Sequence, residues 1–145
     1  MDLKGKTAIV TGGGTGIGAA TAKRLAGIGM NVAINYRSSA DAAEKVATAC
    51  RDMGVEAITV QGDVASDDDC QKIAKTALDT WGGIAVLINN AGTTRFVPHE
   101  NLDGLQMDDF QDLYATNVVG AFQMVRAVVP AMQKAGEGRI VSTSS

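Results

Sequence analysis

The sequence of 145 residues lacks several features that would each indicate a class of protein. It has no apolar run near the roughly 18 residues that suggest a membrane span, so we expect no membrane segment. It has no cluster of Lys and Arg and a net charge of −3, which argues against a nucleic-acid-binding surface. Residues 1–6 lead directly into a short strand pattern, so they do not form a secretory signal.

Side chains that form disulfides or bind metals are also scarce, with two cysteines and one histidine. Cys50 and Cys70 are far apart in segments of helical pattern, and this spacing fits neither a disulfide framework nor a metal site. We therefore expect reduced core thiols, a cytoplasmic protein and no metal. No serine or carboxylate spacing supports a triad with His99, which we interpret as a loop residue.

Apolar runs of strand length alternate with segments of helical pattern along the chain. This alternation predicts an α/β fold: a Rossmann-type, doubly wound parallel sheet of strand order 3-2-1-4-5 with helices on both faces. The length allows one domain, residues 1–145. The strands are expected at residues 7–10, 31–36, 57–60, 86–88 and 139–143.

One predicted helix, from about Met107 to Ala135, is longer than the others. Between Val118 and Met132 it is apolar almost all round, which predicts burial on every side. A chain of this size offers little to cover such a helix, so we expect one side of it to contact another subunit of a homo-oligomer, a dimer or a tetramer. The loop before it, about residues 93–106, has a length typical of substrate contacts or lids.

A glycine-rich turn follows the first predicted strand. Its spacing is T-G-x-x-x-G-x-G, with Gly12, Gly16 and Gly18 as the fixed glycines, and it fits neither the G-x-G-x-x-G nor the Walker spacing. A tight turn of bare backbone before a helix N-terminus is suited to the pyrophosphate of a dinucleotide. The alternative is a flexible turn without a ligand.

This turn resembles that of the short-chain dehydrogenase/reductase family, and further motifs follow in the family's order. Together they cover the chain from Lys4 to Ser145, and they are most similar to the 3-oxoacyl-carrier-protein reductase and glucose-dehydrogenase branches. The motifs are Asp63-Val64 after the third strand, Asn89-Asn90-Ala91-Gly92 after the fourth, Thr116-Asn117 in the long helix, and Ile140 to Ser145, which is similar to I-V-N-I-S-S.

The resemblance implies hydride transfer between a nicotinamide cofactor and a small carbonyl or alcohol substrate. It implies that Asn117 supports a proton relay and that Ser145 positions the substrate oxygen, so these two are the candidate catalytic residues. The candidate cofactor-binding residues are Gly12, Gly14, Thr15, Gly16, Ile17, Gly18, Arg37, Ser38, Asp63, Val64, Asn90, Ala91 and Gly92.

The end of the second strand bears on which nicotinamide cofactor binds. NAD-preferring dinucleotide folds carry an acid there, which accepts hydrogen bonds from the ribose 2′-OH. Here the sequence is Asn35-Tyr36-Arg37-Ser38, with no carboxylate. Arg37 can pair with a 2′-phosphate and Ser38 can donate a hydrogen bond to it. We predict a preference for NADP(H), with NAD(H) and a merely solvated Arg37 as the alternatives.

The family's proton donor is the tyrosine of a Y-x-x-x-K motif, which by the resemblance would follow Ser145. Tyr36 and Tyr114 are the tyrosines present, and neither has a lysine four residues later. We therefore expect these residues to be the N-terminal part of a longer enzyme and to be inactive alone. Two other functions stay open: a non-catalytic dinucleotide-binding module, and a Rossmann-type methyltransferase, which the N-N-A-G motif and Asn117 disfavour.

Overall fold

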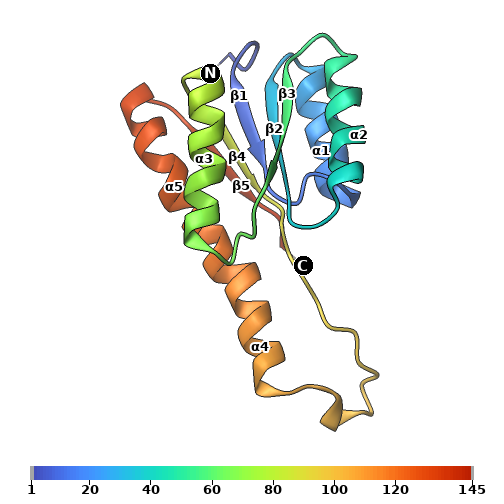
Figure 1. Cartoon of the computed structure of the whole chain (residues 1–145). Coiled ribbons are helices and arrows are strands. Elements are labelled where there is room, and N and C mark those ends of the chain that lie inside the picture. The colour runs from blue at the N-terminus through green and yellow to red at the C-terminus, as the bar shows by residue number, and fades with distance from the viewer. Residues whose placement is uncertain (1, 145) are drawn as a thin grey trace.

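The computed structural model describes residues 2–144, which contain one parallel sheet of five strands in the order β3-β2-β1-β4-β5 (Figure 1). The predicted strand order and direction are confirmed, and three strands differ from the prediction by one residue at the C-terminal end. The strands are β1 (Thr7–Val10), β2 (Asn31–Tyr36), β3 (Ala57–Gln61), β4 (Val86–Asn89) and β5 (Arg139–Ser142).

Helices cover both faces of the sheet, as the doubly wound prediction requires. Helices α1 (Gly16–Gly27) and α2 (Ala40–Arg51) lie on one face, while α3 (Asp67–Trp81) and α5 (Gly120–Ala135) lie on the other (Figure 1). Each face has its own apolar core, because successive side chains of a strand point to opposite faces. In β1, Ala8 and Val10 enter the core with α1 and α2, whereas Ile9 enters the other.

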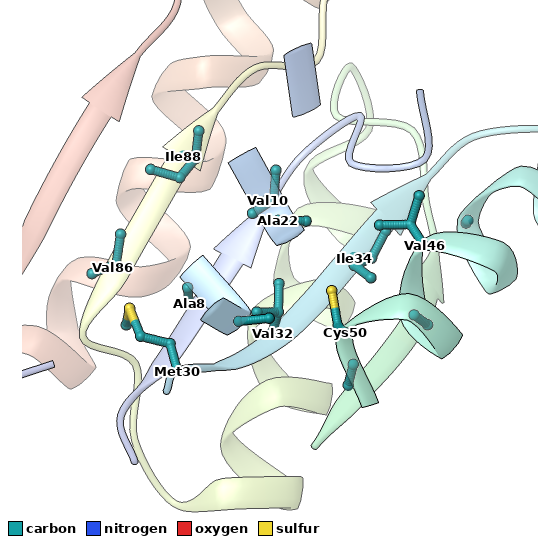
Figure 2. Close-up of a cluster of buried hydrophobic side chains, with 14 of the residues drawn as sticks. Ala8, Val10, Ala22, Met30, Val32, Ile34, Val46, Cys50, Val86 and Ile88 are labelled. Atoms are coloured by element: carbon teal, nitrogen blue, oxygen red, sulfur yellow. The ribbon is translucent and has the colours of Figure 1, made fainter. Parts of the chain in front are cut away.

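Both cysteines are free and buried, one in each core. Cys50 packs among the side chains of α1, α2 and the sheet, as Figure 2 shows. Cys70 lies in α3, and burial raises the pKa of its thiol to about 12. The expected core positions of the two thiols are thus confirmed, and a thiol with so high a pKa stays in its unreactive protonated form at neutral pH.

The segment predicted as one helix from residue 107 to residue 135 is interrupted. It consists of α4 (Met107–Tyr114), a π-helical turn η2 (Ala115–Val119) and α5, and a 3₁₀ turn η1 (Leu102–Gly104) precedes it. The prediction of burial on every side is wrong for the chain by itself. Met124 and Val128 are fully buried, but Phe122 is 61% exposed, because the sheet and α3 cover α5 from one direction only.

None of the helices within residues 2–144 combines the length and the apolar composition needed to cross a membrane.

Candidate functional site

The carboxyl ends of the strands surround an open cavity of about 590 Å³. In doubly wound sheets this edge, where neighbouring loops diverge, is the usual position of a ligand site. Gly18 is the candidate cofactor-binding residue that does not line the cavity. The candidates that do line it are Gly12, Gly14, Thr15, Gly16, Ile17, Arg37, Ser38, Asp63, Val64, Asn90, Ala91 and Gly92.

The glycine turn lies against the start of the loop after β4. Gly12 has φ of +59°, and a Cβ there would lie 3.0 Å from Cα of Ala91. Gly16, which begins α1, has φ of +51°. Both glycines therefore adopt a left-handed backbone that other residues rarely take. Residues of the bare turn and of the first turn of α1 line the cavity, and a helix N-terminus at such a place favours an anion.

Gly18 does not line the cavity, and its surroundings show why a glycine stands there. It is buried, and a Cβ there would collide with the carbonyl oxygen of Gly12 and lie 2.5 Å from Nδ2 of Asn90. The missing side chain thus lets α1 pack against its own turn and against the end of β4. Gly18 shapes the cavity from behind and does not face into it.

Two side chains join the end of β1 to the loop after β4. The Thr11 hydroxyl, which is buried, accepts hydrogen bonds from the amides of Asn90 and Ala91, both at 3.0 Å. Nδ2 of Asn90 donates to the carbonyls of Thr11 at 3.1 Å and Gly12 at 3.2 Å. This role of Thr11 was not predicted from the sequence, although its position at the start of the glycine motif could have indicated it.

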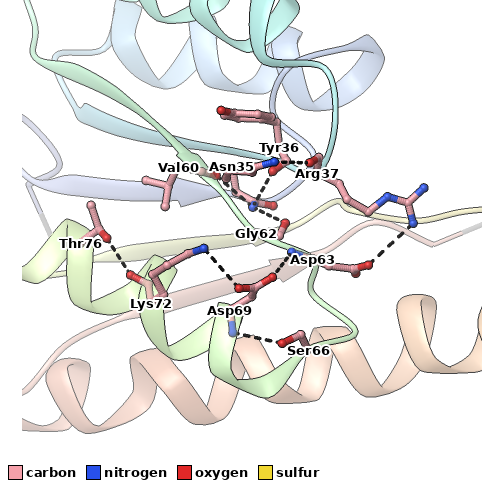
Figure 3. A network of polar contacts seen from close by, with 11 residues as sticks. Asn35, Tyr36, Arg37, Val60, Gly62, Asp63, Ser66, Asp69, Lys72 and Thr76 are labelled. Atoms are coloured by element: carbon pink, nitrogen blue, oxygen red, sulfur yellow. Dashed lines mark hydrogen bonds and ion pairs between the residues drawn. The ribbon is translucent and has the colours of Figure 1, made fainter.

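Asn35, at the end of β2, points into the protein and not toward solvent. Its Oδ1 accepts from the amide of Gly12 at 3.3 Å, and its Nδ2 donates to the carbonyls of Val60 at 3.2 Å and Gly62 at 2.9 Å. Figure 3 shows this amide between the ends of β2 and β3. The sequence drew attention to Asn35 only because it is not an acid, so its contacts were not foreseen.

Arg37 and Asp63 face each other at one end of the cavity (Figure 3). Nη1 of Arg37 lies 3.9 Å from Oδ2 of Asp63, and the arginine side chain is 63% exposed. Oδ1 of Asp63 accepts from the amide of Ala65 at 2.9 Å. Asp63 therefore has a fixed position, while the exposed guanidinium of Arg37 has donors left for a ligand.

A second carboxylate holds the same loop. The amide of Asp63 donates to Oδ2 of Asp69 at 2.8 Å, and Nζ of Lys72 lies 3.2 Å from the other oxygen. That backbone donor, followed by Lys72, lowers the pKa of the Asp69 carboxyl. Ser66 is the N-cap of α3, and its hydroxyl accepts from the amide of Asp69 at 3.3 Å.

Of the two candidate catalytic residues, one lies in the described part of the chain. Asn117 is in the π-helical turn η2 and does not line the cavity, although its neighbour Thr116 does. Its amide forms two hydrogen bonds with the backbone of Thr93, at 2.8 Å to the nitrogen and 2.9 Å to the oxygen. Ser145 lies outside the described residues. Within residues 2–144 no three His, Cys, Asp or Glu side chains gather as metal ligands would.

A model of the short chain dehydrogenase family matches residues 6–145. This chain belongs to the short chain dehydrogenase family. The family resemblance that the sequence motifs indicated is thereby confirmed, and so is the Rossmann-type fold that it implied.

Two curated members of the short chain dehydrogenase family show how the match extends. The chain is 41% identical over 143 residues to the 3-oxoacyl-[acyl-carrier-protein] reductase of Synechocystis sp. and covers 57% of it. It is 35% identical over 147 residues to glucose 1-dehydrogenase 2 of Bacillus subtilis and covers 55% of it. Each match includes 99% of this chain, which thus spans about half the length of the curated relatives it matches.

Solved structures of the family have the same architecture. A short chain dehydrogenase from Burkholderia cenocepacia in complex with NADP aligns with a TM-score of 0.89 at 38% identity, over 100% of this chain and 57% of that one. A 7α-hydroxysteroid dehydrogenase complexed with NADH and 7-oxoglycochenodeoxycholic acid aligns with a TM-score of 0.90 at 34% identity, over 99% of this chain and 54% of that one.

Proposed function

We propose that this chain is the NADP(H)-binding part of an oxidoreductase that transfers a hydride between the nicotinamide and a small carbonyl or alcohol substrate. The observation that carries the proposal is the cavity at the carboxyl edge of the sheet, which joins the glycine turn to Arg37 and Asp63. Its volume of about 590 Å³ is within the range of ligand sites, roughly 300–1,000 Å³.

The residues present fit a dinucleotide. The turn at Gly12 has no room for a side chain, and it leads into the N-terminus of α1, so the pyrophosphate can approach bare backbone amides. Asp63 and Val64, beside Arg37, would hold the adenosine end, and Asn90 to Gly92 would border the path toward the nicotinamide. The bound cofactor supplies the hydride, and the protein supplies position and electrostatics.

The preference for NADP(H) rests on charge. The carboxylate that lines the cavity in the described chain is Asp63, and Arg37 faces it. A guanidinium can pair with a 2′-phosphate through two parallel hydrogen bonds, while Ser38 lies beside it on the same rim. NAD(H) stays the alternative, because one similar solved structure holds NADP and another holds NADH.

The catalytic roles of Asn117 and Ser145 stay proposals. Asn117 fastens Thr93, the residue directly after the cavity-lining Gly92, so it is placed to keep the loop after β4 in position. Relatives named as a reductase and a dehydrogenase favour an enzyme over a non-catalytic module that only binds the dinucleotide. The two buried free thiols favour a reducing compartment, and we propose a cytoplasmic location.

The test of cofactor binding is a calorimetric titration of the protein with NADPH and with NADH. Arg37→Gln should weaken NADPH binding by about tenfold and leave NADH binding unchanged, because only NADPH carries the 2′-phosphate. Arg24→Gln, on the exposed side of α1, is the matched control and should change neither affinity. If Arg37→Gln weakens both cofactors equally, Arg37 does not contact the 2′-phosphate. Absence of binding to both by the parent protein would reject the proposal.

A second measurement separates the enzyme from the binding module when the protein assayed carries the family's Y-x-x-x-K motif. Loss of NADPH absorbance on addition of small ketones or 3-oxoacyl thioesters would then report hydride transfer. Binding without any turnover by that protein across such a panel would favour the module.

A further inference from the structure

We propose that Asn35 is a positioning residue, which sets the gap between the glycine turn and the end of β3 and thereby the site that receives the dinucleotide. The inference rests on the proposed cofactor binding. Asn35 is 2% exposed and comes from β2, which lies between β1 and β3.

The amide of Asn35 connects the two sides of the cavity. On one side, Oδ1 of the Asn35 side chain accepts from the amide of Gly12. The backbone carbonyl of Asn35 accepts from the amide of Gly13 at 2.9 Å. On the other side its Nδ2 donates to Val60 and Gly62, which lie at the end of β3 (Figure 3). One residue thus ties the proposed pyrophosphate turn to the strand end from which Asp63 and Val64 follow.

These contacts need a side chain that donates and accepts at the same time. An asparagine amide offers both, whereas an ionised aspartate of the same shape offers acceptors alone. In Asn35→Asp an ionised carboxylate would face the carbonyl oxygens of Val60 and Gly62, and the resulting repulsion would push β3 away from the turn. A protonated carboxyl would instead donate to one of those carbonyls and still accept from Gly12.

Deprotonation of the carboxyl in Asn35→Asp replaces a hydrogen-bond donor by a negative charge, so the positioning role of Asn35 can be tested by changing the pH. Burial and the facing carbonyls should raise the pKa of the carboxyl in Asn35→Asp above the usual range of about 4. The nearby charged groups on the elements around it are Arg37 after β2, Asp63 after β3, and Asp69 on α3. Arg37 and Asp63 pair with each other, and Asp69 is held by Lys72 and the amide of Asp63.

The experiment measures the Kd of Asn35→Asp for NADPH and for NADH in the full chain, from about pH 5.5 to about pH 8.5. At each pH the value is divided by that of the parent protein, which cancels the titration of the cofactor phosphates. The ratio should be near one at the acid end and should rise about tenfold at the alkaline end, alike for both cofactors. Asn31→Asp, at the other end of β2, is the matched control and should show a ratio near one throughout.

A measurement without cofactor separates this inference from the proposed function. The amide of Gly62 donates to Tyr36 at 2.9 Å, and its hydrogen exchange should become faster in Asn35→Asp as the pH rises, beyond the rise seen in the parent. A pH-independent ratio, or unfolding of the variant without cofactor at alkaline pH, would overturn the positioning role. Absence of binding by the parent would reject the proposed function, whatever the exchange data show.

Discussion

Buried and half-buried polar side chains at the carboxyl ends of the strands hold the cavity together. Thr11, Asn35 and Asn90 each form hydrogen bonds with backbone groups near the strand ends, where neighbouring strands diverge and no longer pair with each other. Backbone groups buried without a partner are costly, so these contacts stabilise the loops as well as shape the site. Apart from the adjacent carbonyl of Tyr36, their partners lie 23 to 80 residues away along the chain, which is why the sequence showed the residues but not their contacts.

Asp69 provides a residue-scale prediction with a defined pH dependence. Its pKa is lowered in the folded protein, so its carboxylate stabilises the fold above the unfolded value of about 4, and this contribution is lost as the pH falls through the folded pKa. Asp69→Asn should therefore lower the free energy of unfolding by about 1 kcal/mol at neutral pH and by less in acid. Urea unfolding at about pH 7 and about pH 3 measures the difference.

Asp68→Asn is the matched control, because Asp68 lies in the same first turn of α3 and is exposed. Asp68→Asn removes a negative charge near the helix N-terminus, as Asp69→Asn does, but it leaves the hydrogen bond between the amide of Asp63 and the carboxylate of Asp69 intact. Equal losses in the two variants would assign the effect to the helix dipole and not to the loop contact.

The strands could be predicted more closely than the long helix, for physical reasons. A parallel strand covered on both faces is a continuous apolar run, so β1, β2 and β4 were evident from the sequence. The break at residues 115–119 has no local signature, because Asn117 is held there by Thr93, 24 residues away. Because the segment is apolar almost all round, its pattern also did not indicate which apolar residues the sheet covers.

The approach of α1 to its turn gives a prediction at the scale of elements. Gly18→Ala should destabilise the fold by about 1–3 kcal/mol and weaken cofactor binding, because the new methyl group would displace Gly12 or Asn90. Gly27→Ala, in the same helix, would meet only Sδ of Met53 at 3.9 Å and should be neutral or stabilising. Thermal unfolding with and without NADPH compares the two, and equal behaviour would contradict the close-approach role of Gly18.

The loop after β4 is fastened where α4 begins. One oxygen of Asp109 accepts from the amide of Gln106 at 2.9 Å, and the other lies 3.1 Å from Nη1 of Arg95. Asp109→Ala should therefore free both ends of the loop and speed its cleavage by proteases about tenfold. Asp108→Ala, on the neighbouring exposed position, should leave the cleavage rate unchanged. Similar rates in the two variants would show that this pair of contacts does not order the loop.

At the scale of the whole molecule, the surface of α4, η2 and α5 is unusually apolar. Large side chains recur every four residues along it and are 49% to 61% exposed. Exposed contiguous apolar surface of this kind is typical of protein contacts. We call this surface the apolar stripe, and we define it by Phe110, Tyr114, Val118 and Phe122. The sequence predicted an unpaired apolar side of this helix, and we propose that a second copy of the chain covers it.

Phe122→Asp tests that proposal. A carboxylate within a self-complementary apolar contact would lie near its own copy or lose its hydration, so association should weaken by at least about a hundredfold. Sedimentation velocity over a range of protein concentrations should then show the parent as a dimer or tetramer and Phe122→Asp as a monomer. Phe96→Asp changes the same residue type at a 94% exposed loop position outside the stripe and should keep the parent's mass. A monomeric parent, or equal masses for the two variants, would mean that the stripe does not join copies of this chain.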